Sequence, residues 1–166
     1  MMSEIIEKNI ARAFSEESKA SDRTAAFVLK AEQEGYSELA RLFRAVADAK
    51  SIHARRFRYI MRGKIGTTEE NMKDALQNEI AAVDNDYPKM VEDAKDGSLA
   101  VRKAFAQSMK TNREFAVLYE NALKDMPTSN DTVYYVCQIC GHIHLNAVPK
   151  NCPVCMAVPG RFKKVL

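Results

Sequence analysis

Four cysteines near the end of the chain are the residues whose types and spacing point most directly to chemistry. They form two C-x-x-C pairs, Cys137 with Cys140 and Cys152 with Cys155, and residues 141–151 separate the pairs. Each pair is a tight turn whose backbone N–H groups can point at the sulfurs and stabilise thiolate charge. Four thiolates suit one tetrahedrally coordinated iron or zinc ion. The spacing therefore predicts a single metal ion held by all four cysteines.

Other interpretations of the cysteines explain less of the pattern. None of the four cysteines is left over, and in a reducing compartment this arrangement favours a metal over disulfides. A redox-active dithiol accounts for one pair but not for the second. His142 and His144 lie beside the cluster in the sequence, and we expect them to surround the site rather than to bind the metal. Gly141 follows the first pair, where a positive φ is convenient, and Pro153 stiffens the second.

Composition and charge limit the class of protein. The 166 residues suffice for one medium domain, or for a domain with a small module, and the 46% apolar share supports a packed core. The apolar runs are too short for a membrane span, and residues 1–10 lack a secretory apolar stretch, so we expect a cytoplasmic protein without membrane contact. The net charge of +3 resides in residues 126–166, whose basic residues are too sparse for a nucleic-acid surface. We therefore expect no nucleic-acid partner.

Helix breakers outline the elements of the larger part of the chain. Residues 3–124 have helical patterning that is interrupted at Gly35, at residues 63–68 and at Asp96-Gly97-Ser98. These interruptions predict four helices of about 25–30 residues each. A threonine N-cap is expected where the third helix begins, and Pro88 is expected to kink that helix.

The character of the sequence changes after the fourth helix. Residues 126–131 have the composition of a linker, and Thr132 to Val136 are β-branched or aromatic, which predicts a short strand leading into the first cysteine pair. We therefore expect a helical domain over residues 1–125 and a small metal-binding domain over residues 132–166.

Each predicted helix carries at least one polar side chain near the middle of its apolar stripe. Burying an unpaired charge costs several kcal/mol, so such residues persist only where partners satisfy them. In a four-helix bundle they can face and satisfy one another, and the alternative is that the helical phase is misjudged and some of them face water. The residues are Glu17, Lys50, His53, Glu79 and Asn112.

The whole chain resembles the rubrerythrin family, an all-α architecture in which a ferritin-like four-helix bundle precedes a small rubredoxin-like metal-knuckle domain. The cysteine module is the most specific part of the resemblance. The matching stretches are Glu17-Ser18 within Phe14–Ala20, Glu34-Gly35-Tyr36, Ala47-Asp48, His53-Ala54, Asn71–Lys73, Tyr87-Pro88, Tyr135–His144 and Cys152–Cys155.

The resemblance implies a di-iron site held by inward carboxylates and Glu-x-x-His motifs, but this sequence keeps few of those ligands. Glu17, His53 and Glu79 match ligand positions and are a remnant that we expect to be free of metal. The positions at which the family's ligands are replaced are Lys50 and Ala82, and Asn112 and Phe115 in the fourth helix. Two carboxylates and one imidazole provide too little negative charge for two metal ions, so a di-iron centre is not expected. We expect the Lys50 ammonium to supply the positive charge that iron supplies in the family, by pairing with Glu17 and Glu79.

Two functions are consistent with these residues. The first is a rubrerythrin-like non-haem iron protein that transfers one electron through the tetrathiolate site to or from a partner protein. The family resemblance implies a peroxide-reducing oxidoreductase and a homodimer, with the bundle of one subunit near the rubredoxin-like domain of the other, but the missing ligands make peroxide reduction in the bundle doubtful. The second is a non-enzymatic dimeric scaffold or regulatory protein whose cysteines hold a structural zinc or iron. A third interpretation, one metal ion bound by Glu17, His53 and Glu79, is disfavoured by Lys50.

Overall fold

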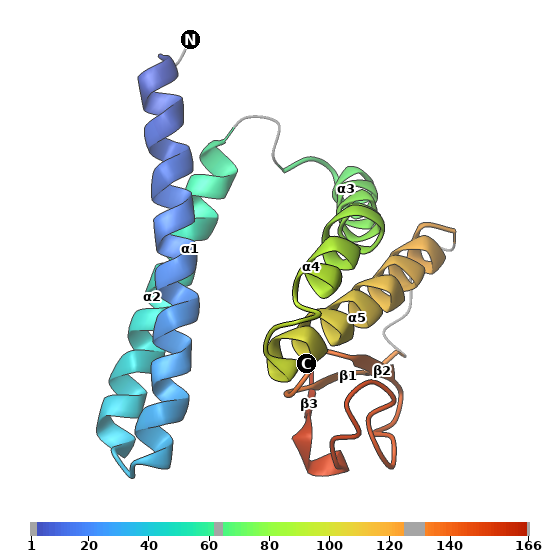
Figure 1. Cartoon of the computed structure of the whole chain (residues 1–166). Helices are drawn as coiled ribbons and strands as arrows, with labels where there is room; N and C mark the ends of the chain where they lie inside the picture. Colours follow the sequence, from blue (N-terminus) through green and yellow to red (C-terminus); the bar gives the residue numbers. More distant parts are fainter. Residues whose placement is uncertain (1–2, 62–64, 125–131, 166) are drawn as a thin grey trace. The chain divides into compact units, whose positions relative to one another are not determined.

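A computed structural model of the whole chain describes residues 3–61, 65–124 and 132–165 (Figure 1). The chain divides into two compact units, Met1–Gly66 and Thr67–Leu166. The division falls between the second and third helical segments, whereas the sequence pattern suggested a break only at residues 126–131. That linker lies outside the described residues. Each unit is described below by itself.

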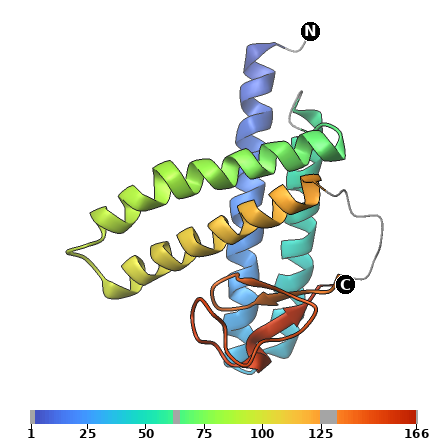
Figure 2. The same cartoon turned by 90° about the vertical axis from the view of Figure 1, so that its right-hand side faces the viewer.

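The first unit is an antiparallel helical hairpin. α1 (Glu4–Gln33) and α2 (Ser37–Ile60) lie side by side in both views (Figures 1 and 2). Gly35 has φ of 82°, a left-handed conformation that favours glycine and ends α1. The buried residues are small, mainly Ala31, Ala40, Ala47 and Ala54, so the helices approach closely. Larger apolar side chains of this unit remain exposed.

The second unit begins with a helical rod that is not one regular helix. α3 (Thr68–Ala81) starts with a capping box in which Thr67 Oγ1 accepts from the Glu70 N–H and the Glu70 carboxylate accepts from the Thr67 N–H. This confirms the expected threonine cap. A π-helical segment, η1 (Ala82–Asp86), then leads into α4 (Tyr87–Asp93).

Pro88 explains part of that interruption. Proline donates no N–H, and its ring clashes with the carbonyl four residues earlier, so an α-helix cannot run regularly through it. The chain inserts a π-helical turn and restarts with Pro88 in the first turn of α4. The expected kink is therefore a change of helix type. α5 (Leu99–Lys124) returns alongside the rod (Figure 2).

A small antiparallel sheet completes the second unit. β1 (Tyr134–Cys137) is its centre, flanked by β2 (Ile143–Leu145) and β3 (Phe162–Lys164), and a 3-10 turn, η2 (Pro159–Arg161), precedes β3. The register pairs Tyr135 with His144 and with Lys164. The strand was expected at Thr132 to Val136 but begins two residues later, because pairing on both edges, rather than β-propensity alone, sets its ends.

None of the helices in the described ranges is long and apolar enough to span a lipid bilayer.

Candidate metal centre

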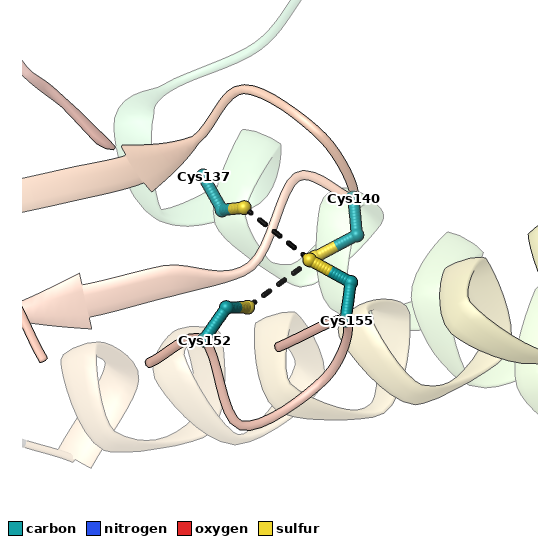
Figure 3. A group of neighbouring side chains, drawn as sticks. All are labelled: Cys137, Cys140, Cys152 and Cys155. Carbon is teal, nitrogen blue, oxygen red and sulfur yellow. Dashed lines mark hydrogen bonds between the residues drawn. The ribbon is translucent and has the colours of Figure 1, made fainter. Parts of the chain in front are cut away.

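The four cysteine sulfurs converge in the small sheet domain (Figure 3). All four Sγ atoms lie within 4.8 Å of one another. The Cys137–Cys155 separation is 3.7 Å and the Cys140–Cys152 separation is 3.6 Å. A tetrahedral ion with metal–sulfur bonds of about 2.3 Å requires sulfur–sulfur edges of about 3.8 Å. The residues present therefore fit one tetrahedral metal ion, and the free thiols form no disulfide.

The two cysteine pairs have nearly the same backbone geometry. Gly141 N–H donates to the Cys137 carbonyl at 2.9 Å, and Met156 N–H donates to the Cys152 carbonyl at the same distance. The Cys137 N–H donates to the His142 carbonyl, and the Cys152 N–H donates to the Ala157 carbonyl, again at 2.9 Å. Gly141 has φ of 79° and Met156 has φ of 64°. The positive φ expected at Gly141 is confirmed. The equivalent positive φ after the second pair occurs at Met156, which carries a Cβ.

Backbone amides point at the sulfurs, as the tight turns predicted. Burial raises the pKa of the Cys137 thiol, but hydrogen bonds from the Cys140 and Ile139 N–H groups and from neighbouring thiols outweigh it and lower the pKa overall. In Cys140 and Cys155 burial prevails and raises the pKa, although the N–H groups of His142 and Ala157 oppose it. Binding a metal therefore requires these thiols to lose protons, which the charge of the ion favours.

The cluster has a closed side and an open side. Cys137 is 1% exposed and Cys152 is fully buried, whereas Cys140 and Cys155 are only partly buried. Apolar residues next to the two open cysteines are exposed, with Ile139 at 59% and Met156 at 69%. Water is thus excluded from one half of the site, while the other half reaches the protein surface.

Contacts from α5 hold the small domain against the helical part of its unit. His142 Nδ1 lies 2.5 Å from Glu114 Oε2, and the Lys110 ammonium donates to the Pro153 carbonyl at 2.9 Å. His142 is buried while His144 is partly exposed, and their rings lie 5.9 Å apart. Sequence patterns did not identify Glu114 or Lys110 as contacts, because nothing in a helix sequence marks which side chain meets a distant loop.

A second polar cluster lies in the α1–α2 hairpin. The Lys50 ammonium donates to Glu17 Oε1 at 3.1 Å, and His53 Nδ1 lies 3.2 Å from Glu17 Oε2. The hydrogen bond from Lys50 lowers the pKa of Glu17, burial opposes this, and His53 adds to the lowering. The expected contact between Lys50 and a carboxylate is therefore present. Among the described residues of this unit no third His, Cys, Asp or Glu ligand joins Glu17 and His53.

The remaining positions singled out in the sequence lie in the second unit. Glu79 is half-buried on α3, and burial raises its pKa. Ala82 is the first residue of η1, and Asn112 and Phe115 are half-buried on α5.

Comparisons of the sequence with known proteins identify relatives of both parts of the chain. A sequence model described as rubrerythrin matches residues 8–124, and a model described as the rubredoxin-like domain of rubrerythrin matches residues 135–163. Rubrerythrin from Porphyromonas gingivalis is 28% identical over 168 residues, which cover 90% of this chain and 84% of that protein. Nigerythrin from Nitratidesulfovibrio vulgaris is 25% identical over 170 residues, covering 93% and 84%.

Solved structures agree with this likeness at the level of the fold. A structure of nigerythrin in a mixed-valence state matches with a TM-score of 0.56 and 24% identity, over 96% of this chain and 86% of that one. The chain therefore belongs to the rubrerythrin family, with a ferritin-like four-helix domain followed by a small three-stranded rubredoxin-like domain that carries a four-cysteine metal site.

Proposed function

We propose that this chain is a rubrerythrin-like electron carrier that holds one iron ion between Cys137, Cys140, Cys152 and Cys155. The observation that carries the proposal is the tetrahedral fit of the four sulfurs. The Cys137 and Cys155 sulfurs lie 3.7 Å apart, and the Cys140 and Cys152 sulfurs lie 3.6 Å apart. Bound iron would supply one-electron chemistry by alternating between the ferric and ferrous states. Support for iron over zinc comes from a related nigerythrin structure that is described as fully reduced and all ferrous.

The residues of this chain would set the properties of that site. Backbone N–H groups of Ile139, Cys140, His142 and Ala157 donate to cysteine sulfurs and stabilise their negative charge. Burial of Cys137 and Cys152 excludes water from one side. These contacts change little with the charge of the site, because the turns are held by backbone hydrogen bonds, and a rigid site needs little rearrangement when an electron moves.

A redox partner protein would dock on the open side of the site. Cys140 and Cys155 reach the surface there, and Ile139 and Met156 offer exposed apolar contacts beside them. Small apolar patches of this kind suit weak and short-lived encounters between electron carriers. The partner is therefore proposed to be a protein with a matching apolar surface near its own redox centre.

The polar cluster of the helical domain is proposed to replace a di-iron centre rather than to hold one. Both oxygens of Glu17 already face donors, Lys50 on one side and His53 on the other. A cation at Glu17 would have to displace an ammonium group and overcome its repulsion. We therefore expect little or no peroxide-reducing activity in this domain. Peroxide-dependent reoxidation of the reduced protein, at a rate that falls in Glu17→Gln, would contradict this expectation.

Metal analysis of protein expressed with added iron tests the proposed function. We expect one iron per chain, a red colour in the oxidised state, bleaching on addition of one electron per iron, and return of the colour on oxidation. Colourless protein with one zinc per chain, under the same iron supplementation, would favour the alternative of a non-enzymatic dimeric scaffold or regulatory protein. Iron that does not change oxidation state reversibly would also contradict electron transfer.

A further inference from the structure

Each cysteine turn is closed by its own backbone hydrogen bonds, but few contacts join one turn to the other. Residues 137–142 form the first turn and residues 152–157 form the second, and in the described part of the small domain no backbone hydrogen bond runs between them. The sulfur contacts drawn as dashed lines in Figure 3 do cross from one turn to the other. Thiolates repel one another, however, when no cation lies between them. The turns themselves therefore do not fix how far apart they lie.

α5 contacts both cysteine turns through two side chains that lie one helical turn apart. The Lys110 ammonium donates at 2.9 Å to the carbonyl of Pro153, which lies inside the second turn. The Glu114 carboxylate lies 2.5 Å from Nδ1 of His142, the last residue of the first turn. Residues i and i+4 of a helix point to the same side and are separated by about 6 Å along the axis. α5 is a regular helix of 26 residues, so it holds these two contact points at a fixed spacing.

His142 connects α5 to the cysteines of the first turn. Its backbone N–H donates to the Cys140 sulfur, and its carbonyl accepts from the Cys137 N–H. Its ring is buried, and within the described ranges Nε2 has no hydrogen-bond partner, so the ring depends on Glu114 for its polar contact. Loss of the partner of a buried polar group is costly. A shift of this ring would also move the backbone groups that hold the two cysteines.

We propose that Lys110 and Glu114 are positioning residues of the metal centre. Together they brace the two cysteine turns at the separation that one tetrahedral ion requires, although neither side chain is a ligand. The brace works only while both ends are attached, because a single contact leaves the other turn free to move. The inference rests on the proposed binding of a metal ion by the four cysteines, but not on electron transfer or on the choice between iron and zinc.

Metal release from the full-length protein tests the brace. Zinc-loaded protein is mixed with a chromogenic chelator under conditions in which the protein stays folded, and the release rate is followed by absorbance. Lys110→Ala and Glu114→Ala should each speed release by roughly three- to tenfold, because each removes one charge-assisted hydrogen bond. Alanine favours helix, so the helical content measured by circular dichroism should not change. The controls are Lys103→Ala and Glu120→Ala, which alter exposed residues of the same helix and should leave the rate unchanged.

A double variant distinguishes a brace from two separate contacts. Lys110→Ala combined with Glu114→Ala should release zinc no faster than the faster single variant, because the first loss already frees the turns to move apart. Two independent contacts would instead give a rate increase equal to the product of the single increases. The two outcomes differ by the full effect of one substitution.

Conservative variants and a spectroscopic probe separate positioning from general stability. Lys110→Arg and Glu114→Gln keep a donor and an acceptor at the same places, so each should restore most of the slow release. Cobalt(II) loaded in place of zinc gives visible bands that depend on the tetrahedral geometry of the four sulfurs. These bands should shift in both alanine variants and in neither conservative variant.

Several results would overturn the brace. Release rates in Lys110→Ala and Glu114→Ala that match the unaltered protein show that α5 does not hold the turns. Multiplying effects in the double variant, or cobalt bands that are the same in every variant, also contradict a shared positioning role. Unaltered protein that binds no metal ion at all overturns the four-cysteine site together with the brace, so this failure is recognised before any variant is compared.

Discussion

The Lys50 ammonium lies 3.1 Å from Glu17 Oε1, at a position where the family resemblance places a metal-binding carboxylate. The Lys50 side chain is 35% exposed and that of Glu17 is 23% exposed, so water screens the pair only in part. The ion pair offsets part of the cost of holding the Glu17 carboxylate in a half-buried position. In the proposal above, Lys50 thereby stands in for a metal ligand.

Removal of that ammonium should destabilise the protein. In Lys50→Ala the Glu17 carboxylate loses its main partner and stays half-buried, so the melting temperature should fall. The matched control is Lys19→Ala, because Lys19 pairs with Glu16 at 3.8 Å with both side chains about two-thirds exposed. Exposed pairs contribute little, so the control should change the melting temperature less. Equal effects of the two substitutions would show that the Lys50 pair is an ordinary surface contact.

Protonation of Glu17 should account for a measurable part of the stability that the protein loses in acid. Its pKa in the folded protein is lowered from the ordinary value of 4.5, so its stabilising contribution is present above that value. The contribution is lost as the pH falls through the lowered pKa, because protonation ends the attraction to Lys50. Urea unfolding as a function of pH should therefore show a smaller loss of stability in acid for Glu17→Gln than for the unaltered protein. Glu16→Gln is the control and should follow the unaltered protein.

Restoring a carboxylate at the lysine position should create dependence on metal. Lys50→Glu places a second carboxylate beside Glu17 and recreates one Glu-x-x-His pair with His53, and the two negative charges repel in the absence of a cation. Thermal unfolding should show a lower melting temperature than for the unaltered protein, with partial recovery on adding Mn²⁺ or Fe²⁺. Lys50→Gln, which adds no charge, should not respond to these ions. Recovery of both variants to the same extent would indicate binding elsewhere.

Loss of one cysteine should release the metal. Cys140→Ser replaces a thiolate by a hydroxyl that does not ionise at neutral pH, so the site loses both charge and a soft ligand. We expect less than one metal per chain and disappearance of the thiolate absorption bands. His144→Ala is the matched control, because His144 follows the first cysteine pair closely in the sequence and is not one of the four ligands, and it should keep full occupancy. Full occupancy in Cys140→Ser would remove the basis of the tetrathiolate assignment.

The two left-handed residues of the metal site offer a reciprocal test of backbone strain. Met156 has φ of 64°, which costs a residue with a Cβ roughly 1–2 kcal/mol, so Met156→Gly should slow metal release in denaturant. Gly141 has φ of 79°, and a Cβ added there would meet no atom within 4 Å. Gly141→Ala should therefore speed metal release through backbone strain alone. A faster release in Met156→Gly would indicate that the methionine side chain stabilises the site through contacts that outweigh the strain.

Several features were determined by the sequence alone, because their causes are local. A C-x-x-C turn positions its own sulfurs and amides within a few residues, so the spacing of the cysteines is enough to identify the two pairs as halves of one metal site. The Thr67 cap and the positive φ of Gly141 also depend only on neighbouring residues. The resemblance to the rubrerythrin family also rests on short stretches, among them the two cysteine pairs, and the matches over residues 8–124 and 135–163 agree with it.

Other features were decided only by the tertiary structure, because they join residues far apart in the chain. The contact between Glu114 and His142 spans a connection whose path no local pattern specifies. The left-handed conformation of Met156 follows from closing the second cysteine turn, and no glycine in that turn indicates it in the sequence. The division between α2 and α3 depends on which residues contact one another in space, which is a property of packing rather than of periodicity.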